Sequence, residues 1–242
     1  MKMSKILCGC LFVLTASYIS AQNSTNQNAS KRSETTVEQD YLSNVEDAII
    51  TELAASDDYD SKLVALEYLE NAVSAGRTSP DMVAALDSLA GEGINKLSRS
   101  NGRVMNNFPD IRAKACDLLG EIPTEASKNT LVGIASDDKE PMVVTAAIRS
   151  LGKIGINEND EVISTIEFIH RKYAALNPTS SLALEVLNAY ESLASTVQDK
   201  SAMIQSISEI ATNYRYVTPV RQKALNLLRS MQSGGSSSGK SK

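Results

Sequence analysis

Two stretches of the 242-residue chain decide its fold: FPDIRAKACDLLGEIP (residues 108–123) and EPMVVTAAIRSLGKIG (residues 140–155). Near its start each carries a proline, which can occupy the first turn of a helix without losing an internal hydrogen bond. Apolar residues then follow at three- and four-residue steps, so they share one face of a helix. The chain therefore encodes the same amphipathic helix twice, which indicates a repeat.

The pattern of this helix recurs around a small residue at its centre. Ile111 and Leu119 stand four positions before and after Ala115. Similar sets centre on Ala65, Ala147, Val186 and Ala224, and the set around Val186 is degenerate. The centres recur at roughly 40 residues, the spacing of helical-hairpin repeats. We interpret this helix as the second helix of each repeat unit. A proline stands at or just before its start in four units, at Pro109, Pro141, Pro178 and Pro219.

The first helices are expected from similar signals. Residues 79–97 predict one helix, with Ser79 as N-cap, Pro80 at the first helical position, and an apolar face that runs from Met82 to Leu97. No stretch alternates apolar and polar residues as a strand does. We therefore expect an all-α fold, a short right-handed α-solenoid of about five helical hairpins over residues 41–232.

The best copies resemble a known repeat. Asp110-Ile111-Arg112 with Leu119-Gly120-Glu121-Ile122, and Val143 and Ala147 with Leu151-Gly152-Lys153-Ile154-Gly155, resemble a HEAT-like repeat of the PBS-lyase type. The resemblance implies stacked helical hairpins with an extended ridge of second helices. Some proteins of this kind are bilin lyases or help to attach chromophores. The family is united by shape, so the resemblance does not by itself imply a reaction.

Both ends of the chain differ in composition from the repeats. MKMSK followed by an apolar run and Ser20-Ala21-Gln22 predicts a signal peptide over residues 1–21, although a retained anchor or lipidation at Cys10 stays open. Residues 22–40 predict a polar spacer, and residues 233–242 a flexible Gly/Ser/Lys tail. We expect export, to the periplasm or as a secreted protein, in a bacterial cell, with no membrane span after cleavage.

Composition narrows the partners and the chemistry. The net charge of −5 and the lack of a basic run argue against nucleic acid. Cleavage of the signal peptide would leave Cys116 as the single cysteine, which we interpret as a small core residue. His170 is the only histidine and is interpreted as an ordinary surface or boundary residue. We therefore expect no catalytic residue, no metal and no cofactor.

Two acidic runs could suggest calcium. Residues 57–60 and 137–138 lack the alternating ligands and the terminal glutamate of a calcium loop. We interpret them as acidic residues at the N-terminal ends of helices, where the helix dipole favours negative charge.

The candidate binding residues lie on the second helices and in the last turn. Arg112 and Arg221 occupy one repeat position, and Lys114 and Lys223 another, so they could form a basic ladder for an acidic partner. They could equally be solvated, or bind acidic turns of adjacent repeats. Tyr214 and Tyr216 are typical interface anchors, although packing against the last helix would also explain them.

These observations favour a non-enzymatic scaffold or adaptor. We expect it to bind another protein of the cell envelope through the second-helix face. One alternative is a structural subunit of an envelope assembly, which predicts a large apolar patch and self-association. Another is a HEAT-like lyase or chromophore-attachment factor, which requires a deep polar pocket with convergent titratable groups. The oligomeric state stays open.

Overall fold

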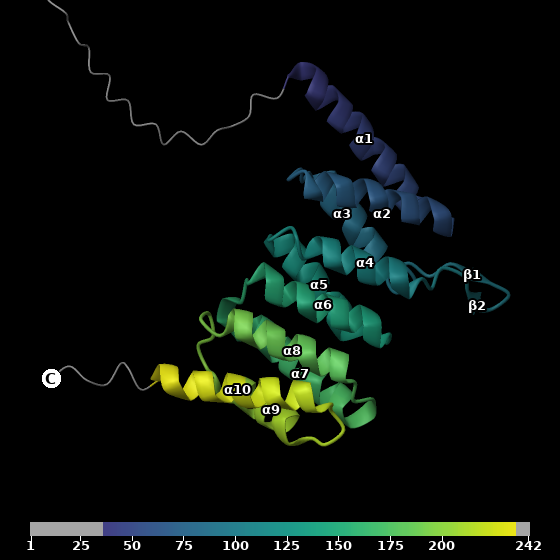
Figure 1. The fold of residues 1–242 in the computed structure, drawn as a ribbon. Helices are drawn as coiled ribbons and strands as arrows, with labels where there is room; N and C mark the ends of the chain where they lie inside the picture. Colours follow the sequence, from purple (N-terminus) through teal and green to yellow (C-terminus); the bar gives the residue numbers. More distant parts are fainter. Residues whose placement is uncertain (1–35, 236–242) are drawn as a thin grey trace, which may run out of the picture. The chain divides into compact units, whose positions relative to one another are not determined.

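The computed structural model describes residues 36–235, and from Val37 onward the chain forms one compact unit. Ten helices in this part account for most of its residues (Figure 1). They are α1 (Val37–Ala55), α2 (Tyr59–Ser74), α3 (Pro80–Ala90), α4 (Pro109–Leu119), α5 (Glu125–Asp137), α6 (Pro141–Ile154), α7 (Glu161–Leu176), α8 (Ser180–Leu193), α9 (Ser201–Thr212) and α10 (Thr218–Gly235). A short 3-10 helix η1 (Glu158–Asp160) precedes α7, and two short strands, β1 (Arg99–Ser100) and β2 (Arg103–Val104), lie between α3 and α4.

The helices pair into five hairpins that stack in two rows. The first helices α1, α3, α5, α7 and α9 pack in sequence, and so do the second helices α2, α4, α6, α8 and α10. Consecutive helices of the second row lie side by side in Figure 1, with α4 against α6 and α6 against α8. This arrangement confirms the all-α solenoid of five helical hairpins expected from the sequence.

Helices α2, α3 and α5 begin at a residue whose side chain accepts a hydrogen bond from an N–H group of the first turn. Asp58 caps α2 by accepting a 2.9 Å hydrogen bond from the Ser61 N–H. Ser79 caps α3, as predicted, and Thr124 caps α5 in the same way. Pro109 and Pro141 lie in the first turns of α4 and α6, where no internal partner for an N–H exists.

The repeated apolar positions form the core. The five predicted centres lie on the second helices, and each is completely buried. Their apolar neighbours four residues away are buried as well, except for the half-buried Leu228 and the polar Ser61. The degenerate copy around Val186 keeps this pattern, so α8 continues the stack between α6 and α10.

Two glycines allow the second helices to approach closely. A Cβ atom at Gly120 would lie 2.7 Å from the Ser150 Cβ on α6, and one at Gly152 would lie 2.7 Å from the Ala189 Cα on α8. Gly120 and Gly152 therefore play the same role in consecutive repeats.

The structure corrects the helix predicted over residues 79–97. Helix α3 ends at Ala90, and Gly93 follows with a positive φ of 72° that favours glycine. Leu97, predicted on the buried face, is half exposed. Strands β1 and β2 then form a small antiparallel hairpin, which was not predicted and which we call the arm (residues 97–106). The arm lengthens the connection between α3 and α4, so Ala65 and Ala115 lie further apart in sequence than the other neighbouring centres.

The ends of the repeat region also differ from the prediction. Helix α1 begins at Val37, inside the stretch predicted as a spacer, and α10 runs to Gly235, inside the predicted tail. The predicted signal peptide lies outside the described residues. None of the helices in residues 36–235 is long and apolar enough to cross a membrane.

Candidate functional site

The exposed side of the second helices carries a series of ion pairs that join neighbouring repeats. Lys114 of α4 contacts Glu70 of α2 at 2.6 Å, and Lys223 of α10 contacts Glu191 of α8 at 2.6 Å. Between them, Lys153 of α6 pairs with Glu121, which follows α4. We call these residues, together with the triad around Arg149 described next, the second-helix ladder.

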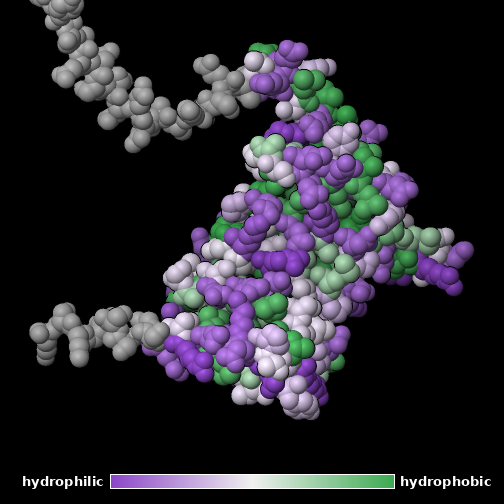
Figure 2. Space-filling model, in the orientation of Figure 1, coloured by the Kyte–Doolittle hydropathy of each residue, from purple (hydrophilic) through white to green (hydrophobic). Residues whose placement is uncertain are grey.

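Arg149 is the centre of this ladder. From α6 it donates hydrogen bonds to Asp117 of α4, at 2.8 Å for the shortest, and it contacts Glu185 of α8 at 3.5 Å. One side chain thus spans three consecutive second helices. Each exposed pair adds only about 0–1 kcal/mol to stability, but together the pairs hold charges of both signs in fixed positions. Figure 2 shows hydrophilic and apolar side chains mixed over this face.

Lys114 and Lys223 therefore lie on the second-helix face, but they bind acidic residues of the preceding repeat. The alternative interpretation, links between adjacent repeats, describes them better than a free basic ladder. Arg149 and Lys153 occupy the same face and were not predicted as site residues. They stand 32 residues after Asp117 and Glu121, at the equivalent positions of the next repeat, and carry the opposite charge. This exchange of charge between equivalent positions was a signal that could have found them.

Arg112 does not belong to an exposed ladder, which corrects the prediction. Its side chain is only 2% exposed and binds the equally buried Asp138, with Nε 2.7 Å from Oδ2. It also donates to the Glu92 carbonyl oxygen and to Asn107 Oδ1. Asp138 in turn accepts a hydrogen bond from the Glu140 N–H at the start of α6. A partner cannot reach Arg112 without unfolding this turn.

Arg221 is separate from Arg112 and from Lys223. It is half buried and hydrogen-bonds to the Thr218 hydroxyl on its own helix at 3.3 Å. Because Lys223 faces α8, a residue two positions away lies on a different side of α10. The predicted set of four basic residues is thus divided among three environments.

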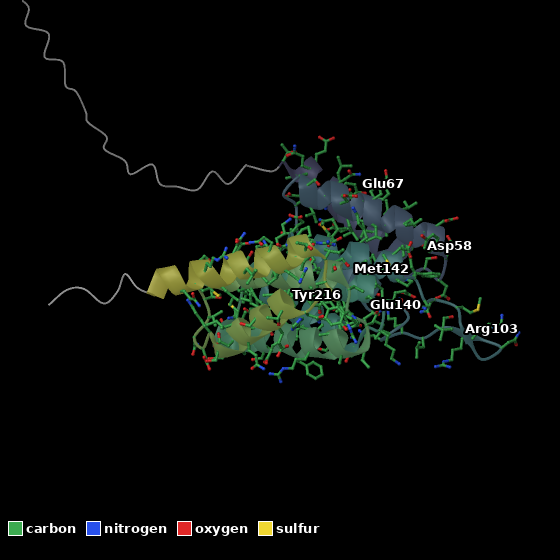
Figure 3. The ribbon with its side chains drawn as sticks, turned by 60° about the horizontal axis from the view of Figure 1, so that its bottom comes forward. Asp58, Glu67, Arg103, Glu140, Met142 and Tyr216 are labelled. Carbon is green, nitrogen blue, oxygen red and sulfur yellow. The ribbon has the colours of Figure 1, made fainter. Side chains whose placement is uncertain are left out.

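The two candidate tyrosines also separate. Tyr214 is exposed at 83%, whereas Tyr216 is 3% exposed and packs among the helices (Figure 3). Tyr216 is therefore a core residue, as the packing alternative held, and only Tyr214 is available to a partner.

His170 and Cys116 are both buried. His170 was interpreted as a surface or boundary residue, but it is 2% exposed, and neither ring nitrogen has a hydrogen-bond partner. Burial lowers the pKa of His170 below its usual value. Cys116 is completely buried in α4, as predicted, and burial raises the pKa of its thiol. A buried neutral thiol is a poor nucleophile.

The arm is anchored by a buried polar network. Lys62 of α2 pairs with Glu92 at 2.8 Å, and both side chains are almost fully buried. Asn106, at the end of the arm, donates to Glu92 Oε1 and to the Lys96 carbonyl, and accepts from the Ser98 N–H. Because Arg112 also binds the Glu92 backbone, this network connects with the Arg112–Asp138 pair.

The exposed part of the arm is basic and partly apolar. Arg99 and Arg103 lie in its two strands, and Leu97, Val104 and Met105 are exposed beside them. Figure 3 shows Arg103 at the far end, away from the helices. The sequence signal for this feature was the absence of acidic residues between Glu92 and Asp110.

Two surface hollows differ in the polarity of the side chains that line them. A groove of about 620 Å³ between α3 and α5 is mostly apolar, and Asp87 is its only ionisable lining residue. A smaller hollow of about 370 Å³ beside the arm is lined by Arg112 and Asp138, which bind each other, and by further charged residues, namely Arg99, Asp137, Lys139 and Glu140. Among the described residues, no group of three or more His, Cys, Asp or Glu side chains could hold a metal ion.

Comparison with known proteins gives one match. A family model described as HEAT repeats matches residues 104–167, from the arm through α4, α5 and α6 into α7. This region contains the two stretches with the clearest repeat pattern. No curated protein and no solved structure matches the chain.

Proposed function

We propose that this chain is a non-enzymatic adaptor that binds another protein through its second-helix face, because its helical hairpins stack as a solenoid and residues 104–167 match HEAT repeats. HEAT repeats in general indicate a protein-interaction scaffold. The proposal adds that this chain is exported, with the periplasm as its site of action and a protein of the bacterial cell envelope as its partner. The predicted signal peptide supports these additions.

The second-helix ladder is the observation that carries the proposal. Its ion pairs cross each interface between neighbouring second helices, so they hold long charged side chains that would otherwise lose conformational freedom on binding. A partner with a complementary charge pattern would meet a surface that is already ordered. Charge complementarity of this kind favours specificity and association rate.

A pull-down with in-cell crosslinking tests the proposal. The double variant Arg149→Glu/Lys153→Glu reverses two bases of the ladder, and Arg171→Glu is the matched control. Arg171 is also exposed and paired, with Glu167, but it lies on α7 in the row of first helices. We expect an envelope partner with the wild type and with the control, and its loss with the double variant, while circular dichroism shows that all three proteins are folded with the same helicity.

Two results would count against this function. Recovery of the same partner by the double variant would rule out the second-helix face. Recovery of the chain alone would favour the structural-subunit alternative. That alternative has its own support, because several apolar side chains are exposed at the N-terminal end of the solenoid.

A further inference from the structure

Both ends of the described solenoid expose apolar side chains. A terminal repeat of a solenoid normally presents a polar outer face, because no further repeat covers it. Here α1 exposes Val37, Tyr41, Leu42, Val45 and Ile49, which we call the N-terminal surface. Figure 2 shows apolar side chains gathered around α1 and α2 at this end. The other end exposes Ile204, Tyr214, Val217 and Leu225, which we call the C-terminal surface.

The two ends carry opposite charges. Helix α1 contains acidic residues and no lysine or arginine, whereas α10 contains basic residues and no acidic one. Arg77 pairs with Glu46 and Asp47 of α1 and neutralises part of the acidic end. Glu38 and Glu52 are exposed and belong to no ion pair within residues 36–235.

On α1 the charges and the apolar residues share one line. Tyr41, Val45 and Ile49 follow one another at four-residue steps, so they lie on the same face of the helix. Glu38 stands three positions before this run and Glu52 three positions after it. Ile50 and Ala54 pack into the core on the opposite side. The exposed line of α1 thus reads acid, apolar, acid.

Helix α10 presents the complementary line. Arg221, Leu225 and Arg229 follow at four-residue steps, which also places them on one face. Lys223 faces α8 through its pair with Glu191, and Val220 and Ala224 face the core. On the helical geometry, the Arg221 line points away from α8 and towards the open end of the described solenoid. It reads base, apolar, base.

We propose that the C-terminal surface of one copy binds the N-terminal surface of a second copy, so that copies associate head to tail. Contact between two N-terminal surfaces would oppose acid to acid, and contact between two C-terminal surfaces would oppose base to base. A head-to-tail contact leaves one free surface at each end, so it can continue into longer assemblies. The contact also leaves the second-helix face open to a partner. The proposal therefore goes beyond the adaptor function, and either of the two can be wrong without the other.

Cysteine crosslinking tests the arrangement of the copies. The full chain is expressed as Val45→Cys or as Leu225→Cys, and the purified proteins are treated with a short bis-maleimide separately and as an equal mixture. Both variants also carry Cys8→Ser and Cys10→Ser, native Cys116 is buried, and the chain with these two serines alone controls for the remaining thiol. We expect a crosslinked dimer in the mixture and none with either variant alone.

Charge exchange tests the chemistry of the contact. In sedimentation velocity, the average mass of the wild type should rise with concentration and fall with added salt. Arg221→Glu/Arg229→Glu should weaken self-association about tenfold, as loss of two exposed pairs implies. A second preparation carries Glu38→Lys/Glu52→Lys and otherwise the native residues. Mixing the two double variants should restore association between copies. Circular dichroism confirms that each variant is folded.

Three outcomes would overturn the proposal. They are a monomer at all concentrations, a crosslinked dimer formed by Val45→Cys alone, and self-association that the charge reversal leaves unchanged. The first would mean that the ends do not bind each other, and the second would mean a symmetric contact. The third would mean that the second copy binds elsewhere.

Discussion

At the scale of single residues, burial separates side chains that the sequence places on the same helix. Arg112 and Lys114 are both basic residues of α4, and both form ion pairs with another repeat. The Arg112–Asp138 pair is buried, whereas about half of the Lys114 and Glu70 side-chain surfaces face solvent. The same type of interaction therefore has different energetic consequences at the two positions.

Arg112→Ala should lower the free energy of unfolding by about 3–5 kcal/mol, because it leaves the Asp138 carboxylate buried without its partner. Lys114→Ala, the matched control, should cost only about 0–1 kcal/mol, because water solvates Glu70 once it is unpaired. Urea unfolding of both variants measures the difference. Equal small losses would show that Asp138 finds another partner or reaches solvent.

His170 should make the fold sensitive to mild acid. Its pKa is lowered by burial in the folded state, so the unfolded chain binds more protons below about pH 6.5. The free energy of unfolding should be level above that pH and fall below it, by up to about 1.4 kcal/mol per pH unit until the folded-state pKa is reached.

His170→Leu should remove this slope between about pH 7 and pH 5.5, a window in which ordinary carboxylates stay ionised. The variant also removes two buried ring nitrogens that have no partner. Urea unfolding at several pH values measures the slope. The same slope in both proteins would assign it to another group.

At the scale of helices, glycine positions set how closely the second helices approach. Gly152 of α6 lies against the backbone of Ala189 on α8, whereas a Cβ at Gly133 of α5 would meet nothing within 4 Å. Both are glycines of helix interiors, so the sequence alone gives them the same helix propensity. Only the neighbouring helix distinguishes them.

Gly152→Ala should destabilise the protein by about 1–3 kcal/mol, because α6 and α8 must move apart to accommodate the methyl group. Gly133→Ala should stabilise it by about 0.5–1 kcal/mol, because alanine is the better helix former at an open position. Thermal unfolding compares the two variants with the wild type. A stabilising Gly152→Ala would mean that α8 yields without cost.

The arm belongs to the same scale and was not predicted. In the sequence, helical periodicity continues from Ser79 to Leu97, but the backbone turns at Gly93. A Cβ at Gly93 would lie 2.5 Å from the Asn106 carbonyl oxygen. The turn depends on contacts between Glu92, Lys62 and Asn106, which are far apart in sequence. Local periodicity contains no information about such contacts.

At the scale of the whole molecule, each second helix packs on the next without interruption. Buried side chains run through all five hairpins of the described region, including the degenerate copy around Val186. In a solenoid, stability depends on interfaces between nearest neighbours, so a weak interface would divide the molecule into separate folding units.

We expect the solenoid to unfold as one unit, because the α6–α8 and α8–α10 contacts are both present. Hydrogen exchange measured in increasing urea should give α2, α6 and α10 a common unfolding midpoint. Earlier exchange confined to α8, α9 and α10 would show that Val186 marks a boundary between two units.

The sequence by itself determined the second helices, their recurrence as repeats and the buried centres from Ala65 to Ala224. These features follow from periodicity and from the capping residues, which act over a few positions along the chain. Only the tertiary structure decided which charges are accessible. Arg112, Tyr216 and His170 look polar and available in sequence, yet their side chains are buried in the folded molecule. The tertiary structure also decided that the line of Tyr41, Val45 and Ile49 on α1 and the line of Arg221, Leu225 and Arg229 on α10 are not covered by another helix. Whether a helix face is covered depends on which elements stack against it.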